Sequence, residues 1–169
     1  MLFRSAECGF ISRDELDQYG RDGSRLLTHV SHRVPGVEFS TGSLGHGLPF
    51  ACGRALASQR LGHPWRTFVM LSDGELDEGS NWEAILFAGH HRLGRLTAII
   101  DYNGIQSLGH VAEVLELHPL GDKFRACHWD VQEIDGHDIP SIQAALGGDR
   151  ERHSAPLAVI ARTVKGKGV

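Results

Sequence analysis

The sequence predicts a three-layer α/β/α fold with a mostly parallel central sheet. Two short runs rich in β-forming residues, 67–71 and 96–100, each stop at polar residues beside a glycine. This is the pattern of buried parallel strands that end in turns. A helical pattern lies between them, and strand, helix and strand within about 35 residues make a βαβ unit. We therefore expect the two strands to be parallel, with a right-handed crossover.

The helix inside this unit is predicted from one apolar stripe. Its members recur at i, i+3, i+4 and i+7, and they are Trp82, Ile85, Leu86 and Gly89. Ser80 or Asn81 is expected to cap its start, and it should end near residues 91–94.

Further elements are predicted on either side of this unit. A helix ending near residue 59 is expected from apolar positions at helical spacing: Leu44, Leu48, Cys52, Ala55 and Leu56. Pro49 limits where that helix starts, because proline is tolerated only in the first turn. Two more strands are expected at 130–134 and 157–161, separated by a helix at 140–146.

Size and composition fit one ordinary globular domain. The 169 residues suffice for a single core, so one domain is expected over residues 1–169. A net charge of -4 argues against nucleic-acid binding, which needs a clustered basic face. No apolar run approaches the roughly 20 residues of a membrane span. We therefore expect a cytoplasmic protein that binds neither nucleic acid nor membrane.

Cysteine and histidine patterns give no metal or disulfide site. The three cysteines are far apart and form no Cys-x-x-Cys motif, so we expect them to be small buried hydrophobic residues. The 11 histidines include no His-x-x-x-His with a carboxylate partner. Most of them are expected to be surface or structural residues.

Both strands of the βαβ unit end at a side chain with an oxygen ligand, Asp73 and Asn103. In open parallel sheets, ligands bind beyond the carboxyl ends of the strands. Mg²⁺ prefers six oxygen ligands, with few from protein carboxylates, so this pair leaves room for a diphosphate. Gly74 permits a close backbone approach, and we expect free N–H groups of the following helix to receive the anion. An Asp-Gly turn alone is more often structural.

The longer strings are much more specific, and they resemble the thiamine-diphosphate signature of transketolases. Asp73 and Asn103 stand 30 positions apart, as that signature requires. The strings are Ser72-Asp73-Gly74-Glu75-Leu76-Asp77-Glu78-Gly79, Trp82-Glu83-Ala84 and Asp101-Tyr102-Asn103-Gly104-Ile105-Gln106. The resemblance covers nearly the whole chain, since it extends to Pro35-Gly36-Val37-Glu38, Ser40-Thr41-Gly42-Ser43-Leu44-Gly45-His46-Gly47, Ile134-Asp135-Gly136-His137-Asp138 and Thr163-Val164-Lys165-Gly166-Lys167-Gly168.

The resemblance implies the thiamine-diphosphate-binding fold, in its diphosphate-binding module, and a ligand set for thiamine diphosphate with Mg²⁺. By residue-to-residue match, Asp73, Asn103 and the carbonyl of Ile105 hold Mg²⁺. Gly74 and Asn103 touch the diphosphate, and Glu75 is a further cofactor-binding residue. Ser72 departs from the family, which has glycine at this position.

The resemblance also implies residues around the cofactor rings and the substrate. Gly42, Ser43 and Leu44 match a loop beside the thiazolium and aminopyrimidine rings. Glu78 matches a glutamate in a carboxylate network between paired active sites; taken alone, it reads as a first-turn glutamate favoured by the helix dipole. His29 stands where the family has a histidine near the substrate, but its neighbours differ from the family's Gly-His-Pro, so a simple loop histidine is an equal alternative.

The implied activity is the transfer of two-carbon ketol units from a ketose to an aldose. In the family, the glutamate that activates the cofactor belongs to a pyrimidine-binding domain, which this sequence does not contain. The resemblance therefore implies a split enzyme, with a separate carboxy-terminal, pyrimidine-binding subunit in a heterotetramer or other dimer-based assembly. Such a chain should expose apolar surface that its partner covers.

Two alternatives stay open at this point. One keeps the cofactor but acts on a 2-oxo acid, by decarboxylation and acyl or acyloin transfer. The other is a noncatalytic scaffold subunit that has retained the fold. The chain is shorter at both ends than typical amino-terminal subunits of split transketolases, and this favours the scaffold, whereas Asp73, Asn103 and the neighbouring glycines favour an enzyme.

Overall fold

The computed structural model describes residues 2–107, 109–148 and 154–168. The chain divides into two compact units, Met1–Leu44 and Gly45–Val169, and each is described by itself. Compactness does not make either unit a domain that folds alone, so the single domain expected over residues 1–169 stays a prediction.

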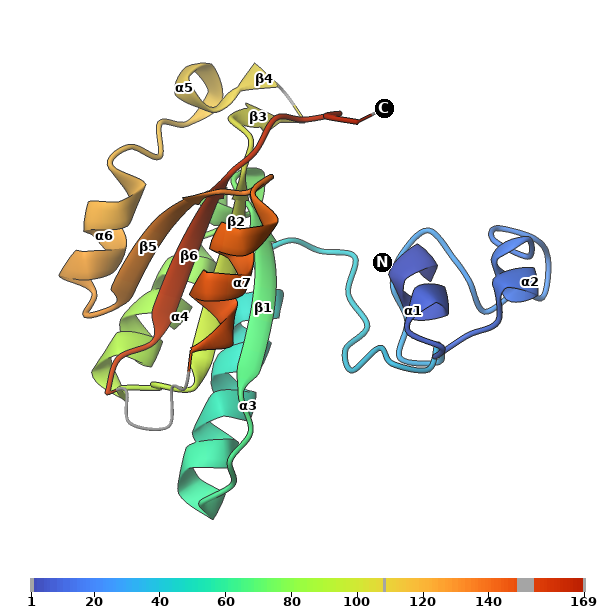
Figure 1. Ribbon diagram of the computed structural model, residues 1–169, viewed down its shortest axis with the longest axis horizontal. Coiled ribbons are helices and arrows are strands. Elements are labelled where there is room, and N and C mark those ends of the chain that lie inside the picture. The colour runs from blue at the N-terminus through green and yellow to red at the C-terminus, as the bar shows by residue number, and fades with distance from the viewer. Residues whose placement is uncertain (1, 108, 149–153, 169) are drawn as a thin grey trace. The chain divides into compact units, whose positions relative to one another are not determined.

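The first unit contains two short helices, α1 (Leu2–Glu7) and α2 (Arg13–Leu16) (Figure 1). The helix α2 begins where Ser12 Oγ accepts a hydrogen bond from Glu15 N–H at 3.2 Å, which is an ordinary N-cap. A small apolar cluster holds the unit together, and its buried members are Ile11, Leu26 and Val34.

A four-stranded parallel sheet forms the centre of the second unit. Its strands are β1 (Thr67–Ser72), β2 (Leu96–Tyr102), β5 (Asp130–Asp135) and β6 (Leu157–Arg162), in the spatial order β1-β2-β6-β5 (Figure 1). The strands β2 and β6 are central, and because they are covered on both faces they read as continuous apolar runs. All four strands begin at the predicted residues and run one or two residues further. The predicted parallel sheet is confirmed.

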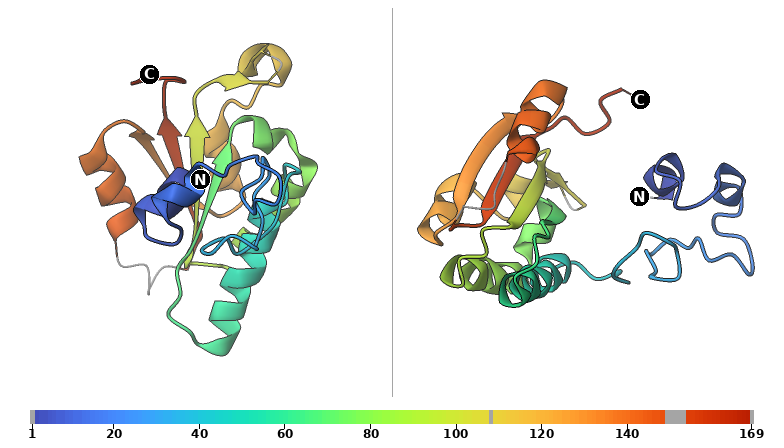
Figure 2. Two further views of the ribbon diagram at one scale, coloured as in Figure 1. Left: turned by 90° about the vertical axis from the view of Figure 1, so that its right-hand side faces the viewer. Right: turned by 60° about the horizontal axis from the view of Figure 1, so that its bottom comes forward.

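Helices cover both faces of this sheet (Figure 2). On one face lie α3 (Gly47–Leu61), α4 (Gly79–His90) and α6 (Leu120–Ala126), and on the other lies α7 (Ile139–Gly147). The larger core cluster lies between the sheet and the first group of helices, and the smaller one lies beneath α7. The three-layer α/β/α architecture is therefore confirmed.

Short elements gather at the carboxyl end of the sheet. The 3₁₀ helix η1 (Gly74–Asp77) follows β1 directly. After β2 come the hairpin strands β3 (Ile105–Gln106) and β4 (Gly109–His110), and then α5 (Val111–Val114). None of the helices in the described ranges has the length and apolar character needed to cross a membrane.

The predicted cap of α4 is wrong. Glu78 occupies the N-cap position, and no side chain caps the helix there. The two expected caps bond elsewhere, because Ser80 Oγ donates to the carbonyl of Gly45 and Asn81 Nδ2 donates to the carbonyl of Glu75.

The predicted apolar stripe of α4 is also partly wrong. Leu86 is 60% exposed, whereas Ile85 is fully buried. Ile85 and Gly89 of the predicted stripe are buried, and the other buried residues of the helix are Asn81 and two small ones, Ala84 and Ala88. A Cβ atom added at Gly89 would lie 1.8 Å from the carbonyl oxygen of Cys127. Close approach to the chain around Cys127 therefore decides which side of α4 is buried.

Two other expectations need correction. Leu44 lies outside α3, which begins at Gly47 with Pro49 in its first turn, and its side chain is exposed. Of the three cysteines, Cys52 is buried and Cys127 is half-buried, but Cys8 is exposed. Cys8 lies just after the short helix α1 at the edge of a small cluster, where little apolar surface is available to cover it.

Candidate functional site

Asp73 ties the ends of β1 and β2 together. It follows β1 directly, and it is only 1% exposed. Its Oδ1 accepts a hydrogen bond from Gly74 N–H at 2.9 Å, and its Oδ2 accepts one from Gly104 N–H at 2.7 Å. The strand register pairs Ser72 with Asp101, so these bonds join two adjacent strand ends. The expected proximity of the two strand ends is observed.

Asn103 shapes the turn that follows β2. Its Oδ1 accepts a hydrogen bond from Ile105 N–H at 3.0 Å, which closes the turn on its own backbone. Gly104 has φ +76, a conformation that favours glycine. The hairpin after this turn is linked to η1, because Gln106 Nε2 donates to Asp77 Oδ1 at 3.3 Å. Two loops from neighbouring strands thus form one hydrogen-bonded rim.

The donor set at this rim fits a hard cation. Each carboxylate oxygen of Asp73 accepts one N–H and retains further acceptor capacity. The ion pairs among the described residues do not include Asp73, and a buried carboxylate without a counter-charge is costly. The described residues contain no group of three or more His, Cys, Asp or Glu side chains that could hold a metal. A carboxylate with spare acceptor capacity is a ligand to which Mg²⁺ adds phosphate and water oxygens.

The N–H groups of η1, a turn that the sequence did not predict, already have partners. Gly74 N–H donates to Asp73 Oδ1, and Glu75 N–H donates to Ser72 Oγ at 3.2 Å. Leu76 N–H donates to the carbonyl of Asp73. The free donors were expected at the helix observed as α4, which has no side-chain cap bond, and that expectation stays a prediction. An anion bound here has to replace one of these bonds.

The two glutamates predicted as site residues, Glu75 and Glu78, have different surroundings. The carboxylate of Glu75 is bonded to the backbone of Gly45, whose N–H donates to Glu75 Oε1 at 3.1 Å. Glu78 is exposed at the N-cap position of α4, where the helix dipole favours a negative charge.

The remaining predicted residues belong to the first unit. Within it, the ring of His29 packs against Gly42, since a Cβ added at Gly42 would lie 2.9 Å from His29 Cγ. Thr41 Oγ1 donates to the carbonyl of Ser43 at 2.9 Å. The side chains of His29 and Leu44 are exposed. The structure therefore brings His29 and Gly42 together in one unit, and Asp73 and Asn103 together in the other.

Some residues of the rim were not predicted as part of the site, and Asn81 was named only as a possible cap of the helix. Asn81 is fully buried, and its Nδ2 donates to the carbonyl of Glu75 at 2.6 Å. Its Oδ1 has no hydrogen-bond partner among the described residues. Thr163 Oγ1 donates to Asp101 Oδ1, which links the ends of β6 and β2. A polar residue at a buried helical position was the available signal for Asn81.

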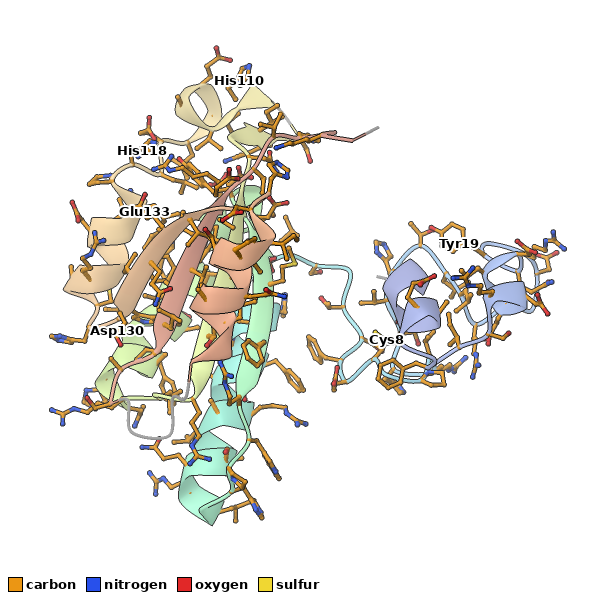
Figure 3. All side chains as sticks on the ribbon, in the orientation of Figure 1. Cys8, Tyr19, His110, His118, Asp130 and Glu133 are labelled. Carbon is orange, nitrogen blue, oxygen red and sulfur yellow. The ribbon has the colours of Figure 1, made fainter. Side chains whose placement is uncertain are left out.

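Further space lies beside the end of β2. A cavity of about 400 Å³ is bordered there by Tyr102, Gly104, Glu116 and two histidines, His110 and His118. Both histidines lie toward the carboxyl end of the sheet, whereas Asp130 marks the opposite end (Figure 3). Burial, followed by the negative charge of Glu116, raises the pKa of Tyr102. The rim is therefore open to a ligand on this side.

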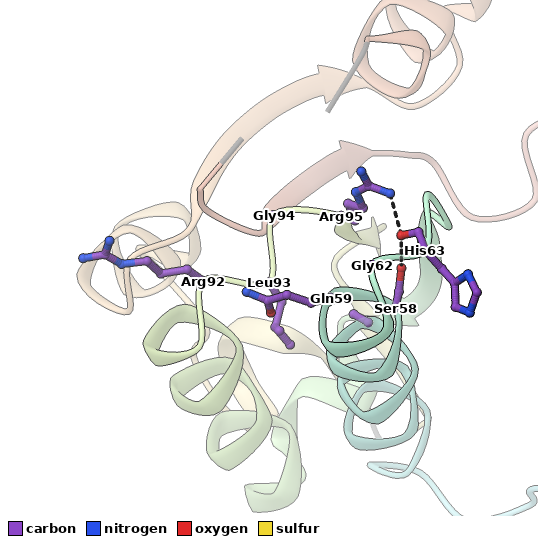
Figure 4. A pocket seen from close by; sticks show the side chains of 9 residues that line it. Ser58, Gln59, Gly62, His63, Arg92, Leu93, Gly94 and Arg95 are labelled. Atoms are coloured by element: carbon purple, nitrogen blue, oxygen red, sulfur yellow. Dashed lines mark hydrogen bonds between the residues drawn. The ribbon is translucent and has the colours of Figure 1, made fainter. Parts of the chain in front are cut away.

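Another cavity, of about 260 Å³, lies at the amino ends of the strands (Figure 4). Its polar groups are already bonded to one another, because Arg95 Nη1 and Ser58 Oγ both donate to the carbonyl of His63, at 2.7 and 2.9 Å. Arg92 extends away from these groups (Figure 4). This cavity is remote from Asp73, so the chemistry favours the carboxyl end as the site.

Comparisons with known proteins agree with this fold and site. Residues 8–169 match the family model described as "Transketolase, thiamine diphosphate binding domain". The chain is 42% identical to one named subunit of the apulose-4-phosphate transketolase of Actinobacillus succinogenes, over 97% of this chain and 59% of that protein. It is 41% identical to 6-deoxy-6-sulfo-D-fructose transketolase subunit SqwG of Clostridium sp., over 95% of this chain and 58% of that protein.

Solved structures show the same relationship. The transketolase of Campylobacter jejuni superposes with a TM-score of 0.83 at 29% identity, over 89% of this chain and 24% of that chain. The chain thus spans somewhat more than half the length of the relatives named above, 58 to 59%. With the family model matched over nearly all of its residues, the chain belongs to the transketolase thiamine diphosphate-binding domain family.

Proposed function

We propose that this chain is the diphosphate-binding subunit of a split transketolase-like enzyme that uses thiamine diphosphate and Mg²⁺. The enzyme transfers two-carbon ketol units from a ketose to an aldose. The observation that carries the proposal is the buried Asp73 carboxylate, which joins two strand ends and has no ion-pair partner among the residues described. Family membership supplies the cofactor class.

In this proposal the rim binds the charged end of the cofactor. Asp73, Asn103 and the carbonyl of Ile105 hold Mg²⁺, which neutralises the diphosphate. Gly74 keeps the loop free of a side chain, and a Cβ there would already touch Gln106 Cγ at 3.4 Å. When bound, thiamine diphosphate supplies the electron sink for carbon–carbon bond cleavage. The chain itself binds and orients the charged end.

The family match assigns further roles to residues of the first unit and to Glu78. We propose that Gly42, Ser43 and Leu44 serve the cofactor rings, and that His29, which packs on Gly42 within the first unit, serves the substrate. Glu78 takes part in a carboxylate network toward a second active site, and its exposed position on α4 suits such a contact.

A pyrimidine-binding partner subunit supplies the activating glutamate in this proposal, within a heterotetramer or another dimer-based assembly. Support comes from the two relatives, both of which are named as transketolase subunits. Exposed apolar side chains on the second unit agree with an associating chain, and they include Phe68, Met70 and Leu86. The named substrates of the two relatives differ, so we propose the class of ketose donors and not one sugar.

Calorimetry with and without the partner chain tests this function. We expect thiamine diphosphate with Mg²⁺ to release binding heat only when the chain and a pyrimidine-domain partner are mixed. No heat in either condition would contradict the proposal and favour a noncatalytic scaffold. With a binding complex in hand, product analysis with ketose and 2-oxo acid donors separates ketol transfer from 2-oxo acid decarboxylation with acyl or acyloin transfer.

A further inference from the structure

Glu75 is held in place at three points, and each contact fixes a different part of the residue. Its N–H donates to Ser72 Oγ at 3.2 Å, and its carbonyl accepts from the fully buried Asn81 at 2.6 Å. Its carboxylate accepts from Gly45 N–H at 3.1 Å. The backbone of Glu75 is therefore fixed between β1 and α4, and its side chain reaches a residue 30 positions earlier in the chain.

Both backbone groups of Gly45 are hydrogen-bonded to side chains. Its N–H donates to Glu75 Oε1, and its carbonyl accepts a hydrogen bond from Ser80 Oγ at 2.7 Å. It is buried with φ +84, and a Cβ added there would lie 2.5 Å from Ser80 Oγ and 2.7 Å from Glu78 Cβ. Only glycine fits this position without displacing its neighbours. We call this arrangement of Gly45, Glu75 and Ser80 the Gly45 clamp.

We propose that Glu75 is a positioning residue for the cofactor rings and does not itself bind the cofactor. This inference rests on the proposed function, in which Gly42, Ser43 and Leu44 contact the rings. Leu44 is bonded directly to Gly45, so the clamp fixes the point where the ring-contacting segment joins the second unit. Glu75 also follows Asp73 by only two residues. The clamp therefore couples the segment for the rings to the loop for the metal.

A carboxylate is suited to holding the N–H of Gly45, because a hydrogen bond to a charged acceptor is stronger than a hydrogen bond to a neutral acceptor. Ser72, which replaces the family glycine, supports the same residue by accepting its N–H. The Ser72 hydroxyl thus bonds to the backbone of Glu75, and the Glu75 carboxylate bonds to the backbone of Gly45. A direct role for Glu75 at the diphosphate would instead leave its carboxylate next to another anion.

Two ligands distinguish positioning from binding. Inorganic diphosphate with Mg²⁺ probes only the metal end of the site, whereas thiamine diphosphate with Mg²⁺ probes both ends. The full chain is titrated with each ligand, with the pyrimidine-domain partner present. The variants are Glu75→Ala, which removes the bond to Gly45, and Glu75→Gln, whose amide oxygen can still accept it. Asp122→Ala, which removes an exposed carboxylate on α6 outside the signature, is the control.

We expect Glu75→Ala to weaken thiamine diphosphate about tenfold, the usual effect of losing one hydrogen bond to a charged group. Binding of inorganic diphosphate should change by less than about twofold, because no contact at the metal end is lost. Glu75→Gln should recover most of the affinity, and Asp122→Ala should bind both ligands like the wild type. Equal weakening of both ligands by Glu75→Ala, or no weakening of either, would overturn the inference.

Hydrogen exchange at the Gly45 amide tests the clamp without any ligand. Exchange should be faster in Glu75→Ala than in the wild type, and close to the wild type in Glu75→Gln, with circular dichroism as the check on folding. Unchanged exchange in Glu75→Ala would overturn the clamp. If the wild-type chain binds neither ligand while the clamp is found by exchange, the proposed function fails and the clamp stands.

Discussion

Asp73 and Asn103 could be located from the sequence because apolar runs mark where strands end. Two neighbouring parallel strands place their carboxyl ends at one edge, and the register confirms this arrangement. The hydrogen bonds at that edge could not be predicted, since they depend on the dihedral angles of short turns. For that reason the turn η1, in which Ser72 and Asp73 accept the N–H groups, was not predicted.

Cys52 carries a prediction about alkaline stability. Burial raises the pKa of its thiol to about 12, whereas an unfolded cysteine ionises at about pH 8.5. As pH rises through this window, the unfolded state loses its proton and the folded state keeps it. The free energy of unfolding should therefore fall by up to about 1.4 kcal/mol per pH unit, and no such loss should occur below about pH 8.

Urea denaturation at several pH values between about 8 and 11 measures how the free energy of unfolding changes over the pH range in which only the unfolded Cys52 loses its proton. Cys52→Ala removes the thiol, so the stability difference between wild type and variant should shrink as pH rises. Cys8→Ala is the control, because Cys8 is exposed. Parallel stability profiles for wild type and Cys52→Ala would contradict the prediction.

At the scale of elements, the strands were predicted well and the faces of the helices less well. A buried parallel strand is a continuous apolar run, and its limits are visible in the sequence. For α4, helical spacing placed both Ile85 and Leu86 on the inner face, yet Leu86 is 60% exposed. The small residues Ala84 and Ala88 occupy the inner face because the helix packs closely, and spacing alone does not reveal the distance to a partner.

The orientation of α4 can be checked by a pair of substitutions. Ile85→Ala should lower the free energy of unfolding by about 2–5 kcal/mol, because it opens a cavity in the core. Leu86→Ala should change it by less than about 0.5 kcal/mol. Urea denaturation of the isolated chain gives both values. A larger loss for Leu86→Ala than for Ile85→Ala would mean that the opposite face of α4 is buried.

At the scale of the whole molecule, no change in composition marks the boundary between Leu44 and Gly45, where the structure divides into two units. The motifs nevertheless extended across both units, and the family match over residues 8–169 bears out that continuity. The sequence of one chain does not reveal the assembly that the chain forms, because the surface of the partner is encoded in another sequence.

The proposed assembly predicts a defined complex in solution. Mixed with a pyrimidine-domain partner, the chain should sediment as one species that contains equal numbers of both chains, because exposed residues such as Met70 are then covered. The mixture should also bind less of a hydrophobic dye than the separate chains do, because less apolar surface is exposed. Sedimentation as a monomer at all concentrations, with every candidate partner, would count against a shared active site.

The proposed binding of one cation by Asp73 and Asn103 is tested most directly by titrating inorganic diphosphate into the chain with and without Mg²⁺. Substitution of a residue that only hydrogen-bonds to a metal ligand lowers metal affinity about 10- to 100-fold. Asp73→Asn removes the charge of a proposed ligand itself, so it should lower the Mg²⁺-dependent affinity at least about 100-fold. Asn103→Ala should cost less, and Asp122→Ala, an exposed aspartate on α6, should cost nothing. Mg²⁺-dependent binding that is undiminished in folded Asp73→Asn would contradict the proposed metal site.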